Sequence, residues 1–225
     1  EEGGYVQANS LCVYEGSSLT YYNNADLNYN TKTFEGTITA PQQDNEIWYT
    51  ATALVHAHYY KDKFGEGTDL VSNVWDETTG KGVITLSGPI TKVSGNAFYD
   101  RVALTSISFP NSVTTIGDNS NSVFTGCPNL ETVKFGSNVQ FIGFQAFWGC
   151  AKLKNVVLPE SLTTIGESAF NSCTALKTIT IPAGVTSIGD FAFNGISDLK
   201  VYCKPVTPPT VGLTPFNKWW AEIYV

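Results

Sequence analysis

Two histidines and five cysteines are the residues of this chain that could most readily bind a metal or act in catalysis. His56 and His58 are the only histidines, and their spacing would put both side chains on one face of a strand, where they could ligate a metal. No carboxylate or cysteine stands in phase with them, so they are only weak candidates for a metal site. No Ser-His-Asp or Cys-His pairing has a supporting sequence context. We therefore predict no metal, no cofactor and no enzyme active site.

Three of the five cysteines recur at an interval of 23 residues, and an isoleucine takes the next place in the same column. These residues are Cys127, Cys150, Cys173 and Ile196. A position that accepts either residue is an apolar core position, where a thiol packs as a small hydrophobe. Three equivalent thiols cannot all pair with one another, so the column predicts free, buried thiols that are too inaccessible to act as nucleophiles. Cys12 and Cys203 lie outside the column and could be free or bridged.

The same interval relates whole segments of the chain. The segments NVQFIGFQAFWGCAKLKNVVLP, SLTTIGESAFNSCTALKTITIP and GVTSIGDFAFNGISDLKVYCKP align without a gap. Three apolar columns run through them, namely Ile142, Ile165 and Ile188; Phe147, Phe170 and Phe193; and Leu153, Leu176 and Leu199. A fixed period of this length is typical of a solenoid, in which each unit buries its apolar side by stacking on its neighbours. About five units fit between Gly88 and Pro205, and DNSNS (118–122) lengthens the second.

Two stretches of each unit are typical of extended chain. The first, L-x-x-I-x-I-P, alternates inward and outward residues and ends at proline or glycine, which stop a strand. The second, V-T-x-I-G, leads into a tight turn and then into the A-F pair. The pattern predicts a mainly β solenoid with short turns at its corners. The outward positions of the first stretch, such as Ser106, Thr132 and Thr178, are small and polar, which suits either broad shallow contact or plain solvation.

The repeating part, residues 88–205, is flanked by two segments that do not follow its pattern. Residues 1–87 hold β-prone stretches at 46–53 and 82–86, and we interpret them as an N-terminal β-rich capping region. Residues 206–225 are interpreted as a C-terminal cap, which could be truncated because the final EIYV is typical of the start of a strand. The chain has no methionine, which indicates a processed or truncated form from which any signal peptide or lipid anchor has been removed.

The net charge of −7 and the scattered basic residues disfavour nucleic acid or an anionic membrane as the main partner. No run of about 18 apolar residues is present, so no transmembrane helix is predicted and membrane association would need the removed lipid anchor. A hydrophobic content of 42% is typical of a globular protein.

The unit CTALKTITIPAGVTSIGDFAF (173–193) resembles the BspA-like class of bacterial leucine-rich repeats. The resemblance covers roughly residues 88–205, and the segments NEIWYTAT and WDETTGKGVITLSGPIT are similar to what precedes such repeats in bacterial surface proteins. It implies a right-handed leucine-rich-repeat solenoid that is secreted or displayed on the outer cell surface. It also implies adhesion to host matrix proteins, other cells or glycans, with no characteristic catalytic residues. The DNSNS insertion and the missing cysteines of the first and last units depart from the pattern.

One unit carries aromatic residues where its neighbours are polar. They are Phe141, Phe144 and Trp148, and Tyr99 and Phe191 lie in or beside the same columns two units away on either side. Neighbouring units hold Thr115, Thr164 and Ser187 in the first column, Glu167 and Asp190 in the second, and Thr125, Asn171 and Asn194 in the third. These five aromatic residues are candidate binding residues, which could stack on sugars or anchor a protein partner. Alternatively, the DNSNS insertion or a neighbouring subunit covers them.

Three hypotheses about function follow from the sequence. The first is a non-catalytic, extracellular or surface-bound adhesion module whose ligand is a protein or glycan on a host or neighbouring cell. The second is a structural spacer or assembly subunit that presents another domain. The third is an enzyme with a site in the N-terminal region around His56 and His58.

Overall fold

The computed structural model of the chain describes residues 41–57, 63–205, 207–216 and 222–224. Residues from Gln43 to Val225 belong to one compact unit. Within the described ranges the regular secondary structure consists of strands only, and no segment there forms a helix that could cross a membrane. Cys12 and His58, which the sequence analysis considers, lie outside these ranges.

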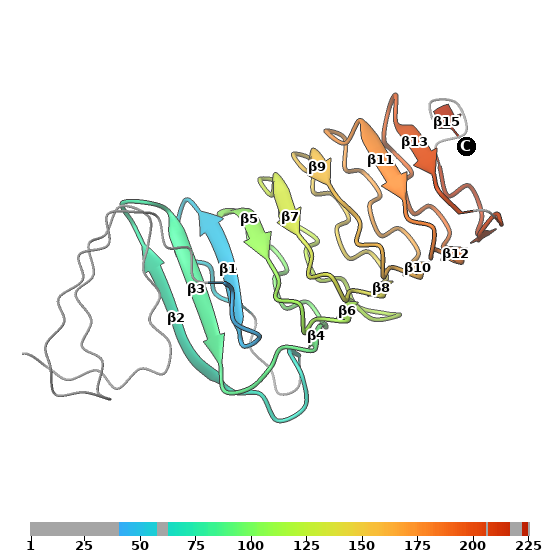
Figure 1. The fold of residues 1–225 in the computed structure, drawn as a ribbon. Helices are drawn as coiled ribbons and strands as arrows, with labels where there is room; N and C mark the ends of the chain where they lie inside the picture. Colours follow the sequence, from blue (N-terminus) through green and yellow to red (C-terminus); the bar gives the residue numbers. More distant parts are fainter. Residues whose placement is uncertain (1–40, 58–62, 206, 217–221, 225) are drawn as a thin grey trace, which may run out of the picture. The chain divides into compact units, whose positions relative to one another are not determined.

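The mainly β solenoid predicted from the period is confirmed, and six coils stack along the chain (Figure 1). Each coil holds a short strand on one side and a second, in most coils longer, strand on the other. The short strands form one parallel sheet: β4 (Lys92–Val93), β6 (Thr115–Ile116), β8 (Phe141–Ile142), β10 (Thr164–Ile165), β12 (Ser187–Ile188) and β14 (Thr210–Val211). The second strands are β5 (Leu104–Ser108), β7 (Thr132–Lys134), β9 (Asn155–Val156), β11 (Thr178–Ile181), β13 (Lys200–Cys203) and β15 (Glu222–Tyr224), and they also run parallel.

Three antiparallel strands precede the first coil. They are β1 (Glu46–Ala51), β2 (Leu70–Asp76) and β3 (Lys81–Leu86), and β1 lies between β3 and β5. Because β1 pairs with β5, the ladder of the second strands continues from the solenoid into this sheet (Figure 1). The inward residues of β1 and β3 join the same hydrophobic core as the coils. Strands β1 to β3 therefore belong to the same compact unit as the repeats.

The core of the solenoid is a stack of phenylalanine rings, one from each coil. The stacked rings are those of Phe98, Phe124, Phe147, Phe170, Phe193 and Phe216. Neighbouring centroids are 5.0 to 5.4 Å apart, and the ring planes differ by at most 10°. On the N-terminal side, Phe64 meets the ring of Phe98 edge-on at 6.2 Å. The Phe column of the sequence is therefore a continuous aromatic column in space.

Backbone hydrogen bonds fix the distance between the stacked rings. The N–H of Phe147 donates to the carbonyl of Ala169 in the next coil at 2.8 Å, and the N–H of Phe170 donates to Ala192 in the same way. The turn segments of neighbouring coils are thus hydrogen-bonded to one another, as the strands are. Since every coil repeats this bond, the rings have little freedom to move apart.

The three phased cysteines are free and fully buried, as the sequence predicts. Each thiol also donates a hydrogen bond to the carbonyl of the stacked phenylalanine in the preceding coil, as in Cys150 to Phe124 (3.4 Å) and Cys173 to Phe147 (3.2 Å). Burial raises the pKa of Cys127 and of Cys173 to about 12. The pKa of Cys150 is likewise raised by burial. Such thiols are not ionised near neutral pH, so they cannot act as nucleophiles there.

The repeat geometry extends past Pro205, where the sequence analysis places the start of a C-terminal segment. Strand β14 pairs with β12, and Phe216 bridges Phe193 at the usual spacing of 23 residues. A sixth coil therefore follows the five that the sequence indicates.

The gapless alignment of the fourth and fifth units is wrong by one residue in the second strand. It sets Val201 opposite Thr178, whereas the structure pairs Val201 with Ile179. Alternation explains the difference, because a slip of one residue turns every side chain of a strand to the other face. The observed register buries Val201 in the core and leaves Tyr202 outside.

We expect Phe147→Ala to lower the free energy of unfolding by about 3–5 kcal/mol, because it removes a fully buried ring and leaves a cavity in the stack. Urea denaturation followed by circular dichroism measures the change. The matched control is Trp148→Ala at the next residue, whose side chain is 41% exposed and should cost less than about 1 kcal/mol. Equal destabilisation by the two variants would contradict the stacked core.

We expect the three phased thiols to resist modification in the folded protein. In a Cys12→Ser background, Ellman's reagent at pH 8 should react first with Cys203, the partly buried cysteine outside the column. Cys127, Cys150 and Cys173 should react only after addition of guanidinium, because burial keeps them protonated and inaccessible. Peptide mapping identifies the modified residues, and rapid labelling of any phased cysteine would show that the column opens.

Candidate functional site

The candidate residues lie on the turn segments that follow the short strand of each coil and lead to its second strand. In the third coil this segment runs from Gly143 to Cys150, and its Ala146 and Phe147 point into the core. We call the outward residues of these segments the turn face. Phe144, Trp148, Tyr99 and Phe191 belong to it. Phe141 precedes it on β8, where it pairs with Thr115 and Thr164 of the neighbouring short strands.

The five aromatic residues differ in exposure. Trp148 is 41% exposed, and Tyr99 and Phe191 are each 38% exposed, whereas Phe141 and Phe144 are half-buried. Among the residues that the structure describes, the aromatic ring pairs are formed by the core phenylalanines and include none of these five. Trp148, Tyr99 and Phe191 therefore present large apolar surfaces to solvent without a ring partner in the described part of the chain.

The DNSNS insertion contacts this coil through its backbone. The carbonyl of Asp118 accepts the N–H of Phe144 at 2.8 Å. The carboxylate of Asp118 turns back onto its own loop, where it accepts the N–H groups of Ser120 (2.8 Å) and Asn121 (2.7 Å). Burial raises the pKa of Asp118, but these hydrogen bonds together outweigh it and hold the pKa below its usual value. The insertion is thus a closed turn beside Phe144, while Trp148 stays exposed.

Phe191 occupies a strained backbone position. Its φ is 55°, in the left-handed region that bulky residues rarely adopt. The same column holds Asn96, Gln145 and Ser168 at φ values of 60°, 47° and 54°. The turn therefore requires a positive φ at this position, and the repeats normally supply a polar residue there. An exposed phenylalanine at this position is unfavourable for both its backbone and its side chain.

Polar side chains flank the exposed tryptophan on both neighbouring coils. Asn171 occupies the Trp148 position in the next coil and accepts a hydrogen bond from Ser172 at 2.8 Å. Thr125 occupies it in the preceding coil, and its hydroxyl donates to the carbonyl of Gln145. The exposed ring can stack on a sugar or a peptide group, and Asn171 adds a half-buried amide on the next coil, whereas Thr125 is buried and its hydroxyl is already hydrogen-bonded.

The weak metal candidates gain no further ligands in the described residues. His56 is exposed and lines a shallow pocket with Leu54, Leu70 and Asn73. The amide of Asn73 is already engaged, since it accepts the hydroxyl of Tyr49 and donates to the carbonyl of Val55. The described ranges contain no group of three or more His, Cys, Asp or Glu residues that could hold a metal ion. His58 lies outside the described residues, so the pair stays the weak candidate that the sequence indicates.

Comparison with known proteins identifies the repeats. The family profile described as "BspA type Leucine rich repeat region" matches residues 91–212 in six copies, which are as many as the coils of the structure. A search of curated proteins finds no match.

Several solved leucine-rich repeat proteins of bacteria are similar to the chain. One from T. pallidum shares 26% identity and a TM-score of 0.48, and the match covers 57% of this chain and 69% of that one. A second, from Bacteroides ovatus ATCC 8483, shares 34% identity and a TM-score of 0.48 over 59% of this chain and 32% of that one. A leucine rich cell surface protein from Faecalibacterium prausnitzii A2-165 shares 28% identity and a TM-score of 0.40, with coverages of 55% and 39%. The chain therefore matches less than half of the length of the second and third of these proteins.

We expect Phe191→Asn to raise the free energy of unfolding by roughly 1 kcal/mol, because asparagine tolerates a positive φ far better than phenylalanine. Urea denaturation measures the gain. Trp148→Asn is the control, since it also replaces an exposed aromatic residue with asparagine but at a position whose φ is not positive. An equal change in both variants would show that lost surface area, rather than backbone strain, sets the effect.

Proposed function

Because the chain belongs to the BspA-type leucine-rich repeat family, we propose that it is a non-catalytic binding module. It recognises a protein or glycan on a host cell or a neighbouring cell through the turn face. It works outside the cell or on the outer cell surface, where such ligands are found. The repeats serve as the scaffold that holds the binding residues at fixed spacing.

The observation that carries this proposal is the exposure of Trp148, Tyr99 and Phe191 on a scaffold that does not need them. Equivalent positions of the next coil hold Asn171 and Ser168 with the same turn geometry, since the N–H of Asn171 donates to the carbonyl of Ser168 as that of Trp148 does to Gln145. Neighbouring coils fold with polar residues at these positions. The fold therefore does not require the aromatic residues. Exposed aromatic residues with little conformational freedom are the side chains that most often dominate binding energy.

The proposal of a non-catalytic role is supported by the state of the reactive side chains. The phased thiols are buried, and burial raises the pKa of each well above neutrality. The pocket beside His56 is otherwise lined by apolar residues and an amide that is already hydrogen-bonded. Neither place provides a nucleophile next to a base, which hydrolysis or group transfer would require.

We expect Tyr99→Ala combined with Trp148→Ala to weaken binding to the ligand found on a glycan and matrix-protein array by at least about tenfold, because each ring would lose its stacking contact. Surface plasmon resonance measures the affinity, and thermal unfolding confirms that the fold is intact. The matched control is Val71→Ala with Val74→Ala, which removes exposed apolar groups from β2 instead. Unchanged binding by the aromatic variant, or an equal loss in the control, would remove the turn face as the binding surface.

Phe141 and Phe144 require a separate variant because they are half-buried. Phe141→Thr and Phe144→Glu introduce the residues that neighbouring coils hold at these positions. A loss of affinity without loss of stability would include them in the binding surface. A loss of stability alone would instead show that they pack within the molecule.

A further inference from the structure

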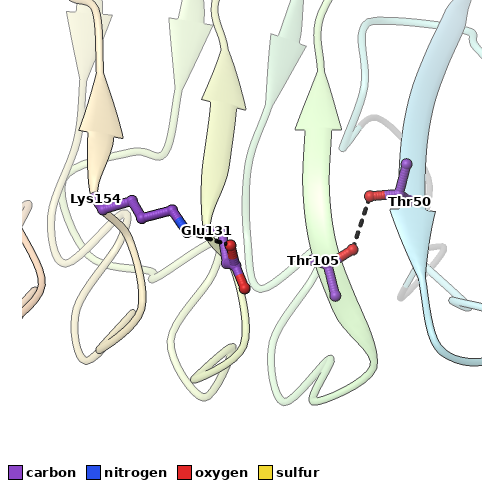
Figure 2. A network of polar contacts seen from close by, with 4 residues as sticks. All are labelled: Thr50, Thr105, Glu131 and Lys154. Atoms are coloured by element: carbon purple, nitrogen blue, oxygen red, sulfur yellow. Dashed lines mark hydrogen bonds and ion pairs between the residues drawn. The ribbon is translucent and has the colours of Figure 1, made fainter.

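A row of mostly charged residues crosses the second-strand side of the solenoid from coil to coil. It lies where the chain passes into the second strands and consists of Thr105, Glu131, Lys154, Lys177 and Lys200, although the one-residue slip of β13 sets Lys200 beside Thr178 rather than beside Lys177. Figure 2 shows its first members, with Thr50 of β1 and Thr105 of β5 joined at 2.7 Å and Lys154 reaching back to Glu131. We call these five residues the lysine row. It starts neutral, passes through one carboxylate and ends in three lysines.

Lys154 and Lys177 set like charges on neighbouring coils, which is unfavourable for the fold, whereas Lys200 lies one residue out of line and pairs in register with Glu222 of β15. Lys154 is offset by Glu131, with a distance of 2.6 Å between Nζ and Oε2, but both side chains are about half exposed. Lys177 follows on the next coil, where its ammonium donates to the carbonyl of Ser197 at 3.1 Å. Like charges on neighbouring strands repel each other, and coils here repeat about every 5 Å. An anion bound along the row would relieve that repulsion.

Two further lysines extend the positive region. Lys152 lies close enough to lower the pKa of Glu131 together with Lys154, whose hydrogen bond to the carboxylate is the larger cause. Lys134 projects from the outer face of β7 and is exposed. The chain as a whole carries a net charge of −7, so a concentration of lysines on one side is a local feature rather than a consequence of composition.

The surface beside the lysine row presents side chains rather than backbone groups. Thr132, Asn155 and Thr178 are exposed, and Tyr202 is 42% exposed at the C-terminal end of the same side. Strand β7 pairs with β5 and β9, and β13 pairs with β11 and β15, so the backbone groups of these strands point along the stack toward neighbouring coils and not out of this face. A peptide strand could not add main-chain hydrogen bonds on this face, whereas a polyhydroxylated chain could bind to hydroxyl, amide and aromatic side chains.

We propose that this side of the solenoid binds an acidic polysaccharide, whose carboxylate or sulfate groups pair with Lys154, Lys177 and Lys200 while its hydroxyls contact Thr132, Asn155 and Thr178. The site is separate from the turn face and does not depend on the function proposed for it. Each sugar contact is weak, and affinity accumulates because successive coils present the same groups at regular spacing. Because the contacts are ion pairs between exposed groups, binding falls with ionic strength.

The test uses the whole chain on surfaces coated with heparin, polygalacturonate, neutral dextran or poly-glutamate. Lys154→Gln with Lys177→Gln removes two charges from the row, and Lys81→Gln with Lys92→Gln removes two charges from β3 and β4 as a matched control. Thermal unfolding of each variant checks the fold. We expect the unmodified chain to bind heparin or polygalacturonate at low salt, and the first variant to lose at least about tenfold in affinity. The control should lose much less.

Heparin and polygalacturonate distinguish sulfate from carboxylate as the group recognised. Absence of binding to both acidic glycans would overturn the proposal, and so would equal losses in the two variants. Tighter binding to poly-glutamate would assign the site to an acidic peptide and overturn it as well. The Tyr99→Ala and Trp148→Ala variant should keep its acidic-glycan binding, so failure here and failure of the turn face are distinguishable.

Discussion

The aromatic stack is the constraint on which the rest of the structure depends. Each coil adds one phenylalanine ring. The backbone N–H of that phenylalanine donates a hydrogen bond to the next coil, which sets the spacing of the rings at 5.0 to 5.4 Å. The thiol of Cys150 can reach the carbonyl of Phe124 only because the two coils are held at this distance. The positive φ values at Gln145 and Ser168 follow from the same requirement, since the turn must bring the next phenylalanine back over the stack. The outward residues have no part in these contacts, which leaves them free to vary.

The sequence predicts this architecture well because the period leaves only one way to bury the apolar columns. The alignment of the repeats fails where one residue is inserted or lost while the neighbouring residues stay the same. Leu199 and Lys200 repeat Leu176 and Lys177, so a gapless alignment is attractive, yet the structure slips by one residue to bury Val201. The alternation of apolar and more polar residues at Val201, Tyr202 and Cys203 indicates the observed register. The sixth coil is hidden for a different reason, because Pro208 and Pro209 replace the usual strand residues while Gly212 and Phe216 keep the spacing.

The candidate sites show a similar limit. Comparing columns is enough to select Trp148 and Phe191 as exceptions, but exposure separates Trp148 from Phe144 only when the turn is seen in three dimensions. The strain at Phe191 depends on a backbone angle, for which the polar residues of its column were the only hint. The sequence analysis does not predict the lysine row, because it compares the outward positions within the strands and not the residue just before each strand. Lys154 and Lys177 occupy that place, and only the stacking of coils brings them side by side.

The two faces of the solenoid differ in chemistry although every coil contributes to both. The turn face combines exposed aromatic residues with Glu167 and Asp190, whereas the strand side gathers Lys154, Lys177 and Lys200. Under the two proposals, a ligand that suits one face would be repelled or left without partners by the other, so the same scaffold would separate two kinds of recognition. Because the stack fixes the spacing on both sides, substitutions in outward columns change what is bound without changing how the coils pack. Specificity in such a fold therefore resides in the residues that break the repeat, and stability in those that keep it.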